Sequence, residues 1–306
     1  MNINILYAAL APIVAILLGL LYIGIGRKII ARLQRRYGPP FYQQYIDTIK
    51  LLAKKTVSSH GVFFSLGPIM GLAGSMVTLL FIPFGSAAPL LSFHGDIILV
   101  MYLVVIAPLG MALGVGEGSN PNGSIGMARG LTLMLAYEVP FVLALFSVVL
   151  YTHTTSIAQI VQSQAGEWSL LKFHGFNWLT FALPISAIVA DICLQGMLGE
   201  KPFDQVIAPH EIASGPMVEY GGKYLGMMVI NHALHIYIET ALFVDIFLGG
   251  GPVWFFIPAT FSVFILSLII NGVLPRFRIG QALKFYWGVP LILAVIGIIY
   301  TMVVIK

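Results

Sequence analysis

The chain has 306 residues, of which 58% are hydrophobic and only 9% carry a charged side chain. Water-soluble domains contain about 25% charged residues, so a soluble globular protein, a disordered chain and a collagen are excluded. The single cysteine, Cys193, excludes an intrachain disulfide and a cysteine-ligated iron–sulfur cluster, which needs about four thiolates. Any redox centre that this chain works with must therefore be carried by a partner.

Long uninterrupted apolar runs dominate the sequence. A transmembrane helix needs about 20 such residues, and these runs differ from the alternating segments of about ten residues that build a membrane β-barrel. No repeat of fixed period occurs, which counts against the commonest transporter architectures. We predict a single all-α integral membrane domain over residues 1–306, with eight transmembrane helices and one cytoplasmic amphipathic helix. The predicted spans are 4–24, 62–84, 95–115, 130–152, 178–198, 224–247, 253–273 and 286–305.

Basic residues are concentrated in alternate loops. The odd-numbered loops hold fourteen of the sixteen Lys and Arg residues, and only Lys172 and Lys306 lie in other segments. Because positively charged loops stay in the cytoplasm, we predict that the odd-numbered loops are cytoplasmic. With eight spans, the N- and C-termini then both lie outside, and the protein is predicted to be a multi-pass protein of the plasma membrane.

The first cytoplasmic loop, 26–60, carries eight basic residues, more than membrane orientation requires. Its second half, Gln43 to Lys55, is predicted to form an amphipathic helix at the membrane surface. One face of this helix holds Ile46, Ile49 and Ala53, and another holds Asp47, Lys50 and Lys54. We interpret the loop as a docking platform for a cytoplasmic partner; the alternative is a solvated basic face that only orients the protein. The predicted docking residues are Arg27, Lys28, Arg32, Arg35, Arg36, Asp47, Lys50 and, from the third loop, Arg129.

The loop 199–223 is predicted to be an acidic cytoplasmic loop. It holds four carboxylates and a histidine, namely Glu200, Asp204, His210, Glu211 and Glu219. In a chain so poor in charge, this clustering suggests a polar cavity or a point of proton entry.

Ionisable side chains inside the bilayer are costly and are therefore candidates for function. Four carboxylates lie inside predicted spans, namely Glu138, Asp191, Glu239 and Asp245. His232, His235 and Glu239 follow one another at i, i+3 and i+7, so they share one face of a helix. Such a column suits a proton relay, because histidine titrates near neutrality. The alternative is that these groups only hydrogen-bond neighbouring helices. No further metal ligand accompanies them, so no metal site is predicted.

Four groups of residues occur in order between about residues 27 and 250. They are Arg32-Leu33-Gln34-Arg35-Arg36-Tyr37-Gly38-Pro39-Pro40 with Gln43, Asp47 and Lys50-Leu51; Arg129 with Tyr137-Glu138; Pro202-Phe203-Asp204 with Glu211 and Glu219-Tyr220; and Leu248-Gly249-Gly250. Each motif is weak alone. Together they resemble the complex I "heel" membrane subunit family, the family of subunit 1 of respiratory-chain NADH dehydrogenase. The Gly-Pro-Pro turn with Gln43 and Asp47 resembles its branch of group 4 membrane-bound [NiFe] hydrogenases and membrane-bound sulfane reductase.

The resemblance implies a non-catalytic membrane subunit of an energy-converting oxidoreductase. It implies that this chain binds no cofactor, and that hydrophilic partners on the cytoplasmic face carry Fe–S clusters and, in the hydrogenases, a [NiFe] centre. The subunit would link redox chemistry on those partners to ion translocation in antiporter-like membrane neighbours. The resemblance leaves the terminal electron acceptor open among protons, a sulfur compound and quinone.

The sequence departs from this family within the acidic loop. Ile207 and Pro209 stand where the family usually has further glutamates, and Met197 stands where a glutamate is common. We expect the column on the sixth span to compensate, or the subunit to transmit conformational change alone. The predicted residues for proton or ion coupling are Glu138, Asp191, Glu200, Asp204, His210, Glu211, Glu219, His232, His235 and Glu239.

Three other functions stay open at the level of sequence. The first is the heel subunit of a quinone-reducing complex I. The second is a stand-alone secondary transporter that binds its coupling ion at Glu138, Asp191 and Glu239. The third is a passive anchor with no ionic role.

Overall fold

The computed structural model describes residues 3–56, 60–85, 87–164 and 178–304. Lys172 and Lys306 lie outside the described residues. Within them the protein is helical, apart from one isolated bridge between Phe84 and Ala87. The helices are α1 (Ile3–Leu33), α2 (Gln43–Ala53), α3 (Val62–Leu79), α4 (Asp96–Gly116), α5 (Pro121–Thr152), α6 (Ile157–Ser163), α7 (Leu179–Ala182), α8 (Pro184–Met197), α9 (Pro209–Ile212), the 3-10 turn η1 (Gly215–Met217), α10 (Gly222–Phe247), α11 (Val253–Val273) and α12 (Ile279–Val304).

The all-α membrane fold is confirmed. Among the described residues, seven helices are long and apolar enough to cross a membrane, and α8 is a shorter apolar helix. They overlap the eight predicted spans, but several begin or end elsewhere. The first helix continues to Leu33, so Arg27, Lys28 and Arg32 lie on α1 and not in a loop. The helix α5 begins at Pro121, so Arg129 is also helical.

The predicted span 178–198 is interrupted near its outer end. The helix α7 stops at Ala182, and α8 starts at Pro184. Leu183 between them has φ −126° and ψ 59°, because a proline disfavours helical geometry in the residue before it. The α8 helix of 14 residues rises about 21 Å, which is short for a bilayer. It is surrounded by α5, α10 and α12.

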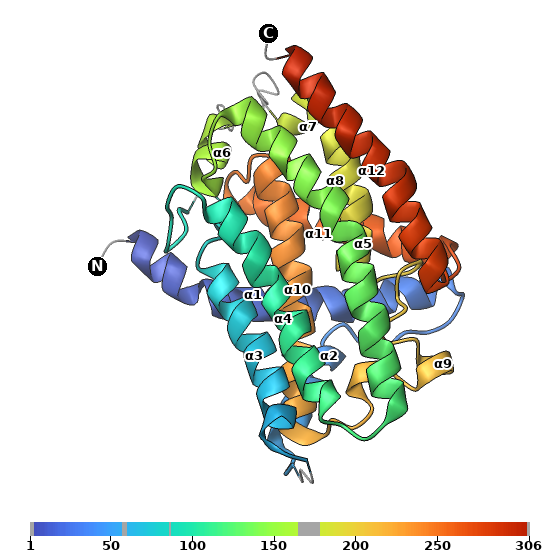
Figure 1. Ribbon diagram of the computed structural model, residues 1–306. Helices are drawn as coiled ribbons and strands as arrows, with labels where there is room; N and C mark the ends of the chain where they lie inside the picture. The colour runs from blue at the N-terminus through green and yellow to red at the C-terminus, as the bar shows by residue number, and fades with distance from the viewer. Residues whose placement is uncertain (1–2, 57–59, 86, 165–177, 305–306) are drawn as a thin grey trace.

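The helix α10 forms the centre of the molecule. Its membrane window is 61% buried, the largest share of the seven, and α1, α2, α3, α8 and α11 all pack against it. Figure 1 shows α1 lying across the other long helices, with α3 and α4 side by side in front of α10. Glycines permit two close crossings. A Cβ on Gly19 of α1 would collide with the Ala233 carbonyl of α10, and one on Gly67 of α3 would lie 2.9 Å from the Gly114 Cα of α4.

The amphipathic helix α2 forms as predicted and packs on α10 and α1. Its buried residues are the polar Gln44 and Thr48. The apolar Ile46 and Ile49 are 36% and 66% exposed. The apolar face of α2 is thus turned outward, as in a helix that lies on a membrane surface.

Candidate functional site

The predicted column on α10 lies in the middle of the bundle. His235 Nδ1 is 3.2 Å from Glu239 Oε1, and Glu239 is only 4% exposed. The other polar atoms of this pair, His235 Nε2 and Glu239 Oε2, are buried without a hydrogen-bond partner among the described residues. Buried polar atoms of this kind are usually satisfied by ordered water, so the column needs space beside it.

Two cavities provide that space on the side of the 199–223 loop. The first, the central cavity, measures about 200 Å³ and is lined by His232, His235 and Asp204 among others. The second, the Arg27 cavity, measures about 290 Å³ and is lined by Arg27, Glu200 and His232. His232 lines both cavities. The first histidine of the column therefore stands at their junction.

Deeper in the bundle, the Glu239 cavity measures about 70 Å³ and is lined by His235, Glu239 and Glu138. His235 and Tyr137 line both this space and the central cavity. Glu138 in turn also lines an outer groove of about 580 Å³ between α4 and α5. Four adjoining spaces thus join the Arg27 region to the outer surface at Glu138, with titratable side chains at each junction. Such a series has the chemistry for proton transfer through side chains and water.

Glu200 follows α8 and faces the Arg27 cavity. It accepts a hydrogen bond from Asn271 Nδ2 of α11. Burial, with a smaller contribution from the negative charge of Asp204, raises the pKa of Glu200 to about 7. Because desolvation disfavours the charged form, Glu200 can gain and lose a proton near neutral pH.

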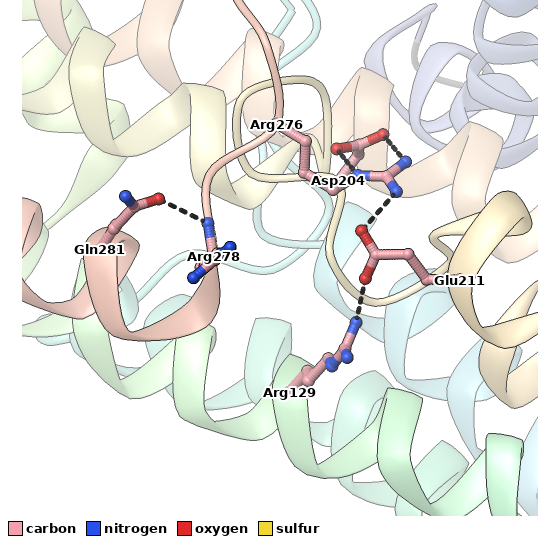
Figure 2. A network of polar contacts seen from close by, with 6 residues as sticks. All are labelled: Arg129, Asp204, Glu211, Arg276, Arg278 and Gln281. Carbon is pink, nitrogen blue, oxygen red and sulfur yellow. Dashed lines mark hydrogen bonds and ion pairs between the residues drawn. The ribbon is translucent and has the colours of Figure 1, made fainter.

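Asp204 and Glu211 belong to an ion-pair network with two arginines (Figure 2). Arg276 Nε and Nη2 donate to the two carboxylate oxygens of Asp204 at 2.7 and 2.6 Å. Glu211 accepts from Arg129 Nη1 at 2.8 Å and from Arg276 Nη1 at 3.4 Å. The hydrogen bond from Arg129 lowers the pKa of Glu211. The network ties α5 to the 199–223 loop and to the segment between α11 and α12.

The other predicted coupling residues lie elsewhere. Glu219 accepts hydrogen bonds from Ser119 N and Oγ at 3.2 and 2.9 Å, next to the end of α4. His210 is exposed on α9, and Asp191 is half-buried on α8. Neither His210 nor Asp191 lines any of the four spaces described above.

The predicted docking residues form an exposed basic surface, with one exception. Arg27 pairs with Asp47 at 3.7 Å, and both are about half exposed. Arg129 differs because its guanidinium is paired with Glu211 inside the ion-pair network. The exposed basic residues at this end of α1 and on α2 are Arg27, Lys28, Arg32, Arg35, Arg36 and Lys50.

Sequence reasoning missed three side chains of this region. They are Arg276, Asn271 and Tyr137 as a lining residue. Arg276 had an available signal, because a buried carboxylate such as Asp204 requires a cationic partner. The sequence predicts no metal site, and no group of three potential metal ligands occurs among the described residues.

Comparisons with known proteins extend over nearly the whole chain. The family model described as NADH dehydrogenase matches residues 5–302. A membrane subunit of the NADH-quinone oxidoreductase of Bacteroides fragilis is 30% identical over 315 residues, covering 93% of this chain and 85% of that protein. The corresponding protein of Dehalococcoides mccartyi is 29% identical over 298 residues, covering 92% and 81%.

A solved structure gives a stronger match. It is a chain from the membrane-bound sulfane sulfur reductase (MBS), an archaeal respiratory membrane complex. The two chains share 40% of their residues with a TM-score of 0.89, and the match covers 97% of this chain and 99% of that one. The resemblance to the complex I heel subunits and to the sulfane reductase branch is confirmed, and this chain belongs to the NADH dehydrogenase family of membrane subunits.

Proposed function

We propose that this chain is the membrane-anchoring and energy-coupling subunit of a complex I-related oxidoreductase of the sulfane reductase or hydrogenase type. It would hold hydrophilic Fe–S subunits at the cytoplasmic side and antiporter-like subunits within the membrane. The observation that carries the proposal is the series of adjoining spaces from Arg27 and Glu200, past His232, to Glu239 and Glu138.

The physical link would be electrostatic. A redox step on a docked partner changes the charge near Glu200, whose proton affinity is already near the neutral range. A buried carboxylate responds strongly to such a change because its charged form is poorly solvated. Proton movement along the His235–Glu239 pair would carry the change toward Glu138.

The exposed basic surface supports the docking part of the proposal. It presents cations at one end of α1 and on α2, which attract acidic partner surfaces. The same charges support a cytoplasmic position for this end of the molecule, with both termini outside. Fe–S clusters and, in the hydrogenase type, a [NiFe] centre would belong to the partners and not to this chain.

The proposal is tested by Glu239→Gln in the complete complex, reconstituted in vesicles with its native electron donor. We expect ion transport per electron transferred to fall by roughly a hundredfold, the lower end of what a positioned proton-transfer group contributes. Thr240→Val is the matched control. Thr240 is the next residue of α10, and its hydroxyl bonds only to carbonyls of its own helix among the described residues.

Unchanged transport in Glu239→Gln would contradict the proposal and favour a passive anchor. Electron transfer that depends strictly on added quinone would favour the heel subunit of a quinone-reducing complex, the type of enzyme that the curated relatives are named for. Ion transport by the isolated chain without redox partners would favour a secondary transporter.

A further inference from the structure

Asp245 is a buried carboxylate that the proposed proton route does not use. It lies two residues before the end of α10 and is 0% exposed. Neither of its carboxylate oxygens has a hydrogen-bond partner among the described residues. It forms no ion pair with any basic residue that the structure describes. An isolated buried carboxylate is very costly unless a proton or a cation neutralises it.

A second buried carboxylate on the same side of the molecule shows how this fold normally satisfies such a group. Asp96, at the start of α4, is also 0% exposed. One of its oxygens accepts from Ile157 N at 2.7 Å, and the other accepts from Ser156 Oγ at 3.1 Å. The contrast indicates that Asp245 is left open for a partner that is not a protein group.

The backbone beside Asp245 is folded tightly around its carboxylate. Three consecutive glycines, Gly249 to Gly251, have φ of +72°, +62° and +84°. Asp245 Oδ1 lies 2.8 Å from the point where a Cβ on Gly250 would stand, and the Gly85 carbonyl oxygen lies 3.5 Å from the same point. The Gly251 carbonyl oxygen lies 2.8 Å from the corresponding point on Gly85. Two carbonyls from separate segments thus converge near the carboxylate.

This combination is suited to a small hard cation. Carboxylate and backbone carbonyl oxygens are the ligands that such ions prefer, and broken helices in membrane proteins bind Na⁺ with helix C-terminal ends and unwound carbonyls. The C-terminus of α10 adds the negative end of its helix dipole. A glycine is needed at position 250, because any larger residue would place its Cβ against the carboxylate.

We propose that Asp245, together with the Gly249–Gly251 turn and the Gly85 carbonyl, forms a binding site for one Na⁺ ion at the end of α10 remote from the 199–223 loop. The inference does not rest on the proposed function. A passive anchor could hold this ion, and a coupling subunit could lack it.

The test uses the complete complex in NaCl and in choline chloride of equal concentration. Carbodiimides react with protonated carboxyl groups, so a carbodiimide should label Asp245 in choline, and Na⁺ should prevent the labelling. Mass spectrometry of the peptides reports each site separately. Glu239 is the internal control, because the geometry around it includes His235 and no converging carbonyls, so its labelling should be the same in both salts.

Two variants complete the test. In Asp245→Asn, which keeps the size of the side chain, we expect the bound ²²Na⁺ to fall by one ion per chain and the Na⁺-dependent rise in Tm to disappear. In Asp96→Asn, both should persist. Equal labelling of Asp245 in the two salts would overturn the proposal and identify a carboxyl that is merely protonated. An unchanged Na⁺ response in Asp245→Asn would overturn it as well.

Discussion

Glu200 and Glu211 belong to one loop, yet their surroundings drive their acidities apart. Burial raises the pKa of Glu200 to about 7, whereas the hydrogen bond from Arg129 lowers the pKa of Glu211. Pairs of carboxyls in contrasting environments often divide the roles of proton carrier and fixed charge. We interpret Glu200 as the group that exchanges protons and Glu211 as a permanent anion that positions Arg129 and Arg276.

This difference predicts a pH dependence of stability. The pKa of Glu200 is raised in the folded protein, so the stability due to its bound proton is complete below the ordinary glutamate pKa of 4.5. That stability is lost as pH rises toward 7, at no more than ~1.4 kcal/mol per pH unit. Glu200→Gln should remove this slope. Its unfolding midpoint should exceed that of the wild type above pH 7, measured by thermal unfolding in detergent.

Glu211→Gln supplies a control of opposite sign. The folded-state pKa of Glu211 is lowered, so its contribution is present at neutral pH and is lost only in acid. This variant should lower the midpoint at pH 7. A midpoint of Glu200→Gln that follows the wild type from pH 5 to pH 8 would refute the role given to Glu200.

At the scale of the elements, helix ends depart most from the predicted spans. Hydropathy measures where apolar residues lie, while capping decides where a helix begins. The helix α5 starts at Pro121 because Asn120 Oδ1 accepts a hydrogen bond from Asn122 N at 3.0 Å, an N-cap followed by proline. That signal was present in the sequence, and so was Pro184, which separates α7 from α8. Counting apolar residues overlooked both.

The outward apolar face of α2 predicts contact with lipid. A spin label at Ile49→Cys should collide mainly with oxygen dissolved in the bilayer, and one at Lys50→Cys mainly with a water-soluble nickel chelate. The two positions are neighbours on the chain but lie about 100° apart around a helix. The native Cys193 is fully buried, so it adds no label. Equal accessibility to both reagents at the two positions would contradict a membrane-surface helix.

At the scale of the whole molecule, the route from Arg27 to Glu138 is assembled from distant parts of the chain. Its walls come from α1, α4, α5, α10 and the 199–217 segment. The helix α1 reaches this route only because it crosses α10 at a steep angle (Figure 1). A molecule built in this way has a basic face at one end and a lipid-facing groove beside Glu138, which are two separate surfaces for partners.

This arrangement predicts the composition of the native complex. Gentle detergent purification through a tag on this chain should recover hydrophilic Fe–S proteins together with membrane subunits. Metal analysis should find iron without nickel, because the matched solved chain comes from a sulfane sulfur reductase. Nickel with iron would point to a hydrogenase. A lone, metal-free chain would contradict the proposed function.

The sequence alone determined the class of fold, the sites of the long helices and the family. Apolar runs of sufficient length have few alternatives in a membrane, since backbone groups must be paired within helices or closed barrels. The column at His232, His235 and Glu239 was equally readable, because helical periodicity places i, i+3 and i+7 on one face without knowledge of any neighbour.

Only the tertiary structure decided what these groups face. The pairing of Arg129 with Glu211, the partner of Asp204 and the isolation of Asp245 depend on which helices meet. No local pattern encodes such contacts, because side chains far apart in sequence are brought together by packing of the whole bundle. Asp245 and Asp96 are both acids at the ends of apolar helices, and only the folded chain gives one of them partners and leaves the other without any that the structure describes.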